Sequence, residues 1–157
     1  MDNKQFIKYI LNMVKGCRHP NQTMNILLLN GFKELNRGAW KRVYYNSDYP
    51  TWVIKVFKRR TGWYHDHSTC GIMPKTIKKY WLSNIYVCRR FVIQPYANGI
   101  GGTSKEAKQM IDQEIPNSYE NYDIWSNNVM FHNNRPVVID YSHKKNKRHK
   151  FRWPTLI

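Results

Sequence analysis

Residues 123–140 read DIWSNNVMFHNNRPVVID, and they carry the clearest local pattern of the chain. Two apolar runs, 129–131 and 137–139, flank four residues with Asn133-Asn134 at their centre. This pattern predicts two antiparallel strands joined by a tight turn. Pro136 lies near the start of the second strand, where a missing N–H is tolerated. We therefore expect a β-hairpin.

Oxygen-bearing side chains flank this hairpin. Asn128 precedes the first strand and Asp140 follows the second, so antiparallel pairing places them opposite each other within about one residue of register. Magnesium accepts such amide and carboxylate oxygens and completes its octahedron with phosphate oxygens and water. Asp123, in the loop before Asn128, is placed to accept a hydroxyl proton. Taken singly, Asp and Asn beside strands are most often turn and cap residues.

A lysine interrupts an apolar strand further upstream. Three strands are predicted over 32–35, 40–45 and 51–57, which form an antiparallel meander. Within the third strand, Lys55 points to the same face as Val53 and Phe57 and therefore interrupts one of two apolar faces. A buried ammonium needs an anionic partner, whereas the alternative is a lysine whose stem packs while its head reaches water.

A glycine precedes the second of these strands. Gly38 lies in the tight turn between the first two strands, where a missing side chain lets backbone N–H groups approach a phosphate. The alternative is an ordinary turn glycine.

The rest of the chain reads as alternating helices and strands. A first helix over 6–14 follows an Asp2–Gln5 capping pair, and a glycine-rich connection at 95–102 is placed to hinge two lobes. The other expected elements are helices over 21–29, 62–70 and 104–115, the last beginning at Ser104, and strands over 76–81 and 85–93.

The order of these pieces resembles the protein-kinase fold. More narrowly, residues 31–56 and 123–140 resemble the early serine/threonine protein kinases of short-tailed bacteriophages. The resemblance implies an α+β, minimal two-lobed fold with an antiparallel sheet in the N-lobe and a small, truncated helical C-lobe. Within a single domain, 1–157, it implies N-terminal helices (1–30), a sheet (31–95), a C-lobe (96–141) and a basic tail (142–157).

The resemblance also implies a role for each candidate residue. Lys55 would bind the α- and β-phosphates of ATP, and Gly38 would belong to the loop that covers them. Asp123 would be the catalytic base, and Asn128 and Asp140 would bind magnesium. The implied function is phosphorylation of serine or threonine in a host protein. Small-molecule kinases resemble the same Asp-x-x-x-x-Asn and Ile-Asp motifs, so a small hydroxyl compound is an alternative substrate.

Departures from the family pattern accompany this resemblance. Of the three loop glycines only Gly38 remains, with Asn36 and Lys41 at the other two places. Asp66 is the only acid between Lys55 and the predicted hinge. Only 17 residues follow Asp140, which implies that substrate docking is abbreviated or supplied by a partner.

The charge balance supports a second functional class. With 26 Lys plus Arg against 10 Asp plus Glu, the chain has a formal charge of +16 and should attract an acidic partner. The alternative function is therefore an inactive kinase-like module that inhibits a host factor or binds nucleic acid through its basic surface.

Other features bear on location and metals. Neither a basic-then-apolar leader nor a membrane span is visible, so we expect a cytoplasmic protein without membrane contact. Three cysteines, an odd number, suggest reduced thiols. His65, His67, Cys70 and Cys88 are a zinc alternative, which competes with simple packing of these side chains.

Overall fold

The structure, a computed structural model, describes residues 1–38, 40–59, 75–118 and 124–140. The chain forms two compact units: the first unit comprises Met1–Cys70 and Leu82–Ala97, and the second comprises Gly71–Trp81 and Asn98–Ile157. Several predictions lie outside the described residues, namely the helix over 62–70, the roles of Asp66 and Asp123, the zinc ligands His65, His67 and Cys70, and the basic tail 142–157.

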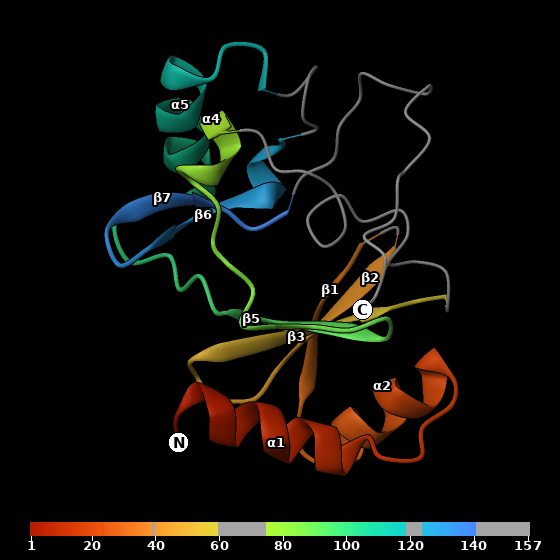
Figure 1. The fold of residues 1–157 in the computed structure, drawn as a ribbon. Coiled ribbons are helices and arrows are strands. Elements are labelled where there is room, and N and C mark those ends of the chain that lie inside the picture. The colour runs from red at the N-terminus through yellow and green to blue at the C-terminus, as the bar shows by residue number, and fades with distance from the viewer. Residues whose placement is uncertain (39, 60–74, 119–123, 141–157) are drawn as a thin grey trace. The chain divides into compact units, whose positions relative to one another are not determined.

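The first unit contains a five-stranded antiparallel sheet (Figure 1). Its order is β1-β2-β3-β5-β4, so β3 is the central strand. The predicted α+β class and the predicted meander are both confirmed. The strands are β1 (Lys33–Arg37), β2 (Lys41–Tyr45), β3 (Trp52–Phe57), β4 (Tyr86–Val87) and β5 (Phe91–Pro95).

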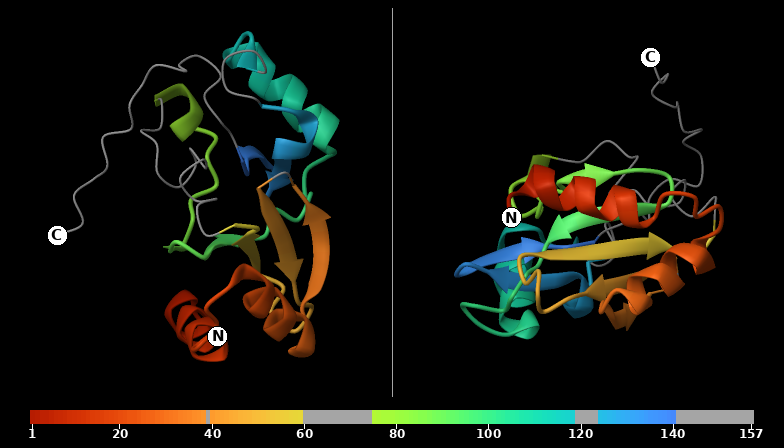
Figure 2. Two further views of the ribbon diagram at one scale, coloured as in Figure 1. Left: turned by 90° about the vertical axis from the view of Figure 1, so that its right-hand side faces the viewer. Right: turned by 90° about the horizontal axis from the view of Figure 1, so that it is seen from below.

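Two helices cover one face of this sheet (Figures 1 and 2). Helix α1 (Asn3–Met13) begins with the predicted capping box: the Gln5 N–H donates to Asp2 Oδ1 at 2.8 Å, and the Asp2 N–H donates to Gln5 Oε1 at 2.9 Å. Helix α2 (Pro20–Leu29) has its proline at the first turn, where the missing N–H has no intrahelical partner to lose. Both predicted N-terminal helices are confirmed.

The core of the first unit lies between these helices and the sheet. Phe6 of α1 stacks on Trp52 of β3 with ring centroids 4.3 Å apart, and Trp52 Nε1 donates to Asn3 Oδ1 at 2.8 Å. The buried cluster comprises Phe6, Ile10, Val14, Met24, Leu27, Phe32, Tyr44, Trp52, Ile54, Val56, Phe91 and Ile93.

Two predicted strands are wrong. Residues 76–81 do not form a strand: helix α4 spans Lys75–Lys78, and Trp81 forms an isolated parallel bridge to Val138. Ile77 explains the difference, because its fully buried side chain anchors one helical turn in the core of the second unit. Residues 85–93 are not one strand but the β4–β5 hairpin, which turns at 88–90.

The second unit packs a helix on a hairpin (Figure 1). Helix α5 (Ser104–Glu114) is capped by Thr103 rather than by the predicted Ser104, because the Glu106 side chain reaches back to the Thr103 N–H at 2.7 Å. The 3₁₀ helix η2 (Ser126–Asn128) leads into β6 (Val129–His132) and β7 (Arg135–Val138). The buried cluster comprises Ile77, Ala107, Ile111, Ile115, Ile124, Val129, Phe131 and Val138.

The hairpin prediction is confirmed. Asn133 and Asn134 have φ of 49° and 63°, the pair of left-handed conformations that a two-residue type I′ turn requires. The division between the units falls at Ala97–Asn98, inside the connection predicted as a hinge. The glycines of that connection, however, are bound to the hairpin, since the Gly99 N–H donates to the Phe131 carbonyl at 2.9 Å.

Within the four described ranges, no helix combines the length and the apolar character needed to cross a bilayer.

Candidate functional site

Asn128 and Asp140 lie at the open end of the β6–β7 hairpin. The register pairs Val129 with Val138, and the ladder continues one step further because the Ile139 N–H donates to the Asn128 carbonyl at 2.8 Å. Asn128 is therefore opposite Ile139, and Asp140 is the next residue. The expectation that the two positions lie within about one residue of register is confirmed.

Local contacts fix the approach to Asn128. The Asn128 N–H donates to the Trp125 carbonyl at 2.9 Å, which closes the η2 turn. Ile124, at the start of this segment, is fully buried in the core of the second unit and anchors it. Asn128 and Asp140 are both half-buried and both make interactions in the structure. The backbone thus holds one amide and one carboxylate at one end of the hairpin.

The chemistry of this donor pair suits a hard cation. Magnesium is usually bound by one or two protein carboxylate or amide oxygens, with phosphate and water oxygens in the remaining positions. Asn128 and Asp140 meet this requirement. Among the described residues, no group of three His, Cys, Asp or Glu side chains gathers as a metal cluster.

Lys55 lies at the centre of the first unit's sheet. It pairs with Val43 of β2 and with Val92 of β5, and only 6% of its surface is exposed. All six residues of β3 are buried. Trp52, Ile54 and Val56 belong to the core under the helices, so Lys55 occupies the opposite face of the sheet, as the alternation predicted.

Gly38 lies in the turn between β1 and β2 and is exposed. A Cβ added at Gly38 would come 3.3 Å from the Lys41 carbonyl oxygen, so the turn packs closely against the start of β2. Lys41 is itself 93% buried, with 7% exposed. Sequence reasoning noted Lys41 only as a replaced glycine. Its spacing from Val43, two residues apart on one strand, is the signal that could have placed it on a buried face.

The structure thus places Asn128 and Asp140 at one end of the hairpin in the second unit. In the first unit it places Lys41 and Lys55 in one sheet, with Gly38 in the turn before β2. Asp123 lies outside the described residues.

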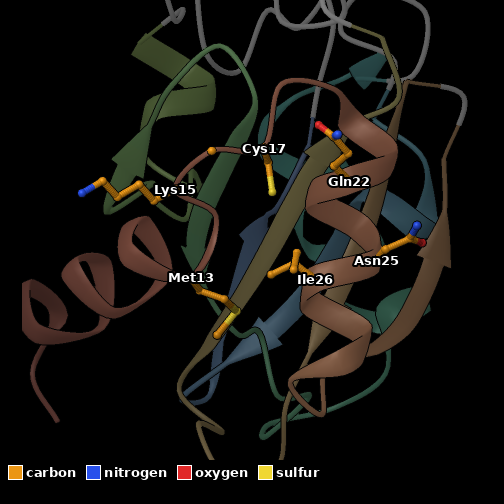
Figure 3. A pocket seen from close by; sticks show the side chains of 7 residues that line it. Met13, Lys15, Cys17, Gln22, Asn25 and Ile26 are labelled. Atoms are coloured by element: carbon orange, nitrogen blue, oxygen red, sulfur yellow. The ribbon is translucent and has the colours of Figure 1, made fainter.

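A separate pocket of about 420 Å³ lies where α1 ends and α2 begins (Figure 3). The Lys15 side chain points away from α2 in this view. Cys17 contributes a free, half-buried thiol, and Cys88 elsewhere in the unit is likewise free. None of the predicted site residues lines this pocket; its walls are Met13, Lys15, Gly16, Cys17, Gln22, Asn25 and Ile26.

Ion pairs in the second unit have a structural role. Lys79 Nζ lies 2.6 Å from Glu114 Oε2 and lowers the pKa of that exposed carboxyl. Lys108 lies 2.6 Å from Asp112, whose carboxylate also accepts a 2.5 Å hydrogen bond from the buried Ser118 hydroxyl. The Lys79–Glu114 pair and the Ser118 hydrogen bond tie α5 to the segments beside it, whereas the Lys108–Asp112 pair lies within α5.

Neither the models of protein families nor the curated proteins include a match to this chain. The functional assignment therefore depends on the residues described above.

Proposed function

We propose that this protein is a protein-kinase-like phosphotransferase that uses ATP and magnesium to phosphorylate serine or threonine hydroxyls of a host protein. The observation that carries the proposal is the pairing of Asn128 with Ile139, because it sets the Asn128 amide and the Asp140 carboxylate at the same end of one hairpin. In protein kinases, magnesium is held by an asparagine after the catalytic aspartate and by an aspartate after a following strand.

Each residue has a role in this proposal. Asn128 and Asp140 would hold the magnesium ion, which would neutralise negative charge on the phosphate oxygens. Lys55 would bind the α- and β-phosphates, as the lysine on the third strand of a kinase sheet does. Asp123 would orient the attacking hydroxyl and accept its proton. Gly38 would let the β1–β2 turn approach the phosphates.

The position of Lys55 adds independent support. A lysine stem is easily accommodated in a buried strand, but its ammonium loses hydration there and gains most from an anionic ligand. Lys55 lies on the third strand of an antiparallel sheet and is only 6% exposed. A phosphate-binding lysine in kinases occupies the same kind of position.

Thermal unfolding with and without ATP and magnesium tests the proposal. A ligand that binds only the folded state at 100 times its dissociation constant stabilises it by about 2.7 kcal/mol. We expect this stabilisation in the wild-type chain and its loss in Asp140→Ala, together with loss of phosphate transfer to protein substrates. Asp48→Ala, which changes an exposed turn carboxylate, is the matched control. Full phosphate transfer by a well-folded Asp140→Ala protein would refute the assignment.

The basic surface favours a second candidate function. An inactive kinase-like module that inhibits a host factor or binds nucleic acid would need a surface rich in positive charge. In the described part of the first unit, the exposed carboxylates are Asp2 and Asp48. The exposed basic residues there are Lys4, Lys8, Lys15, Arg18, Lys33, Arg37, Arg59 and Arg89.

Salt dependence separates the two candidates. Binding through this surface should weaken steeply with salt, because it releases counterions. It should survive Asp140→Ala and weaken when the basic residues after Asp140 are neutralised. Complex formation that changes neither with salt concentration nor with neutralisation of the tail would exclude this candidate.

A further inference from the structure

The face of the sheet that carries Lys55 holds a second buried lysine. In the β2–β3 register, Val43 is opposite Lys55 and Lys41 is opposite Phe57. Lys41 is two residues from Val43, so its side chain projects from the same face as Lys55. The two lysines are 7% and 6% exposed. Diagonal neighbours of this kind lie about 7–8 Å apart, within joint reach of one ligand through their long side chains.

Both lysines make interactions in the structure. What distinguishes the pair is that two like charges project from one buried face.

Two ammonium groups on one buried face select for a particular ligand. Two cations at diagonal positions can contact a ligand at two separate points, and a ligand with adjacent negative charges makes a charge-assisted hydrogen bond at each. A linear oligophosphate carries charge at successive phosphorus atoms, whereas a monophosphate concentrates it at one.

We propose that Lys41 and Lys55 together bind the oligophosphate of a nucleoside triphosphate, with Lys41 as a second phosphate-binding cation. This inference rests on the proposed function and extends it. A Cβ added at Gly38 would lie 3.3 Å from the Lys41 carbonyl oxygen, so the Lys41 side chain begins where the turn that is proposed to cover the phosphates ends. Lys41 also occupies one of the places where the kinase pattern has a glycine, so a side-chain charge replaces backbone N–H groups in binding phosphate.

The test measures binding of a series of phosphates to the full chain. Isothermal titration in the presence of magnesium would compare ATP, AMP and inorganic tripolyphosphate for wild type and Lys41→Met. We expect Lys41→Met to weaken ATP and tripolyphosphate about tenfold or more, the equivalent of one charge-assisted hydrogen bond, and to change AMP affinity less than twofold. Lys33→Met, on the exposed edge strand of the same sheet, should bind all three as wild type does.

A second variant covers the case in which Lys41→Met does not fold. Lys41→Arg keeps the charge and most of the length, so it should retain ATP affinity within a few-fold, whereas Lys41→Gln should lose it as Lys41→Met would. If a lysine at this position only packs its stem, Lys41→Gln and Lys41→Arg would bind ATP equally well, and the inference would be overturned.

The outcomes also separate this inference from the proposed function. Wild-type protein that binds neither ATP nor tripolyphosphate would overturn both. Wild-type protein that binds ATP in the Asp140-dependent manner, with Lys41→Met binding it equally well, would overturn only the role of Lys41. An equal loss of ATP and AMP affinity in Lys41→Met would also overturn it, because the second charge would then not distinguish an oligophosphate from a monophosphate.

Discussion

The main-chain N–H of Asn134 donates a 2.8 Å hydrogen bond to the carbonyl of Ile100, which joins the tip of the β6–β7 hairpin to the glycine-rich connection. The neighbouring Gly101 makes this approach possible. A Cβ at Gly101 would lie 2.7 Å from Asn134 Cα and 2.8 Å from Phe131 Cδ1, and its φ is +121°. Gly101 is therefore required by packing.

Gly101→Ala should destabilise the protein strongly. The new methyl overpacks against backbone, which typically costs 1–3 kcal/mol, and the backbone angle adds a strain of about 1–2 kcal/mol. Urea unfolding of the full chain measures the change. Gly16→Ala is the matched control: its φ is +91°, but nothing lies within 4 Å of the added Cβ. Equal losses for the two variants would contradict the packing argument.

Asn134→Val should lower the unfolding free energy by about 1–2 kcal/mol or more, because a β-branched residue tolerates a φ of 63° poorly. Asn134→Gly should be close to neutral, since glycine adopts this conformation readily. Urea denaturation compares the two. A stable Asn134→Val protein would show that the turn can change type without loss of the hairpin.

Asn128→Ala should remove the magnesium-dependent part of the stabilisation by ATP while changing the stability of the ligand-free chain little. The main-chain hydrogen bond from Ile139 remains in this variant, so the hairpin register is kept. Thermal unfolding with ATP, with and without magnesium, gives the readout. Asn127→Ala, one position earlier in η2 and exposed, should behave as wild type. Equal responses from the two variants would exclude Asn128 as a ligand.

Tyr9 should make stability pH-dependent in alkaline solution. Burial, followed by hydrogen bonding to Tyr49, raises the pKa of Tyr9 to about 12, whereas an unfolded tyrosine titrates near 10. The folded state thus keeps the proton more tightly, so this contribution is complete below pH 10 and disappears as the pH rises through about 12. Guanidinium unfolding at intervals between pH 9.5 and 12 should show a shallower decline for Tyr9→Phe than for wild type or Tyr45→Phe. Identical slopes would remove Tyr9 as the cause.

Local signals predicted those parts of the fold that depend on neighbouring residues. The Asp2–Gln5 box and the Asn133-Asn134 turn are decided by side chains and backbone angles within a few residues, and the structure contains both. The alternation around Lys55 likewise determined its face, because period-2 geometry follows directly from the strand.

Tertiary contacts decided what the sequence did not predict. The helical turn at Lys75–Lys78 is too short for periodicity to be read, and burial of Ile77 fixes it. The β4–β5 turn at 88–90 has no Gly, Pro or Asn to signal it. The spacing within β2 puts Lys41 on the face of Val43, but only the pairing of β2 with β3 shows that this is also the face of Lys55. For the candidate site, sequence therefore indicated Lys55, Asn128 and Asp140 but not the second lysine.

The segment containing α4 has a consequence for folding during synthesis. Ile77 packs with residues of α5 and the hairpin, and the Tyr80 carbonyl accepts a 2.7 Å hydrogen bond from the Val138 N–H. The sheet strands of the first unit end at Pro95, so they emerge from the ribosome well before these partners. Synthesis proceeds at roughly 5–20 residues per second, so Ile77 of the α4 segment stays exposed for some seconds before its partners emerge. A nascent chain arrested after Pro95 but before the hairpin has emerged would expose the apolar α4 segment, which a chaperone can bind.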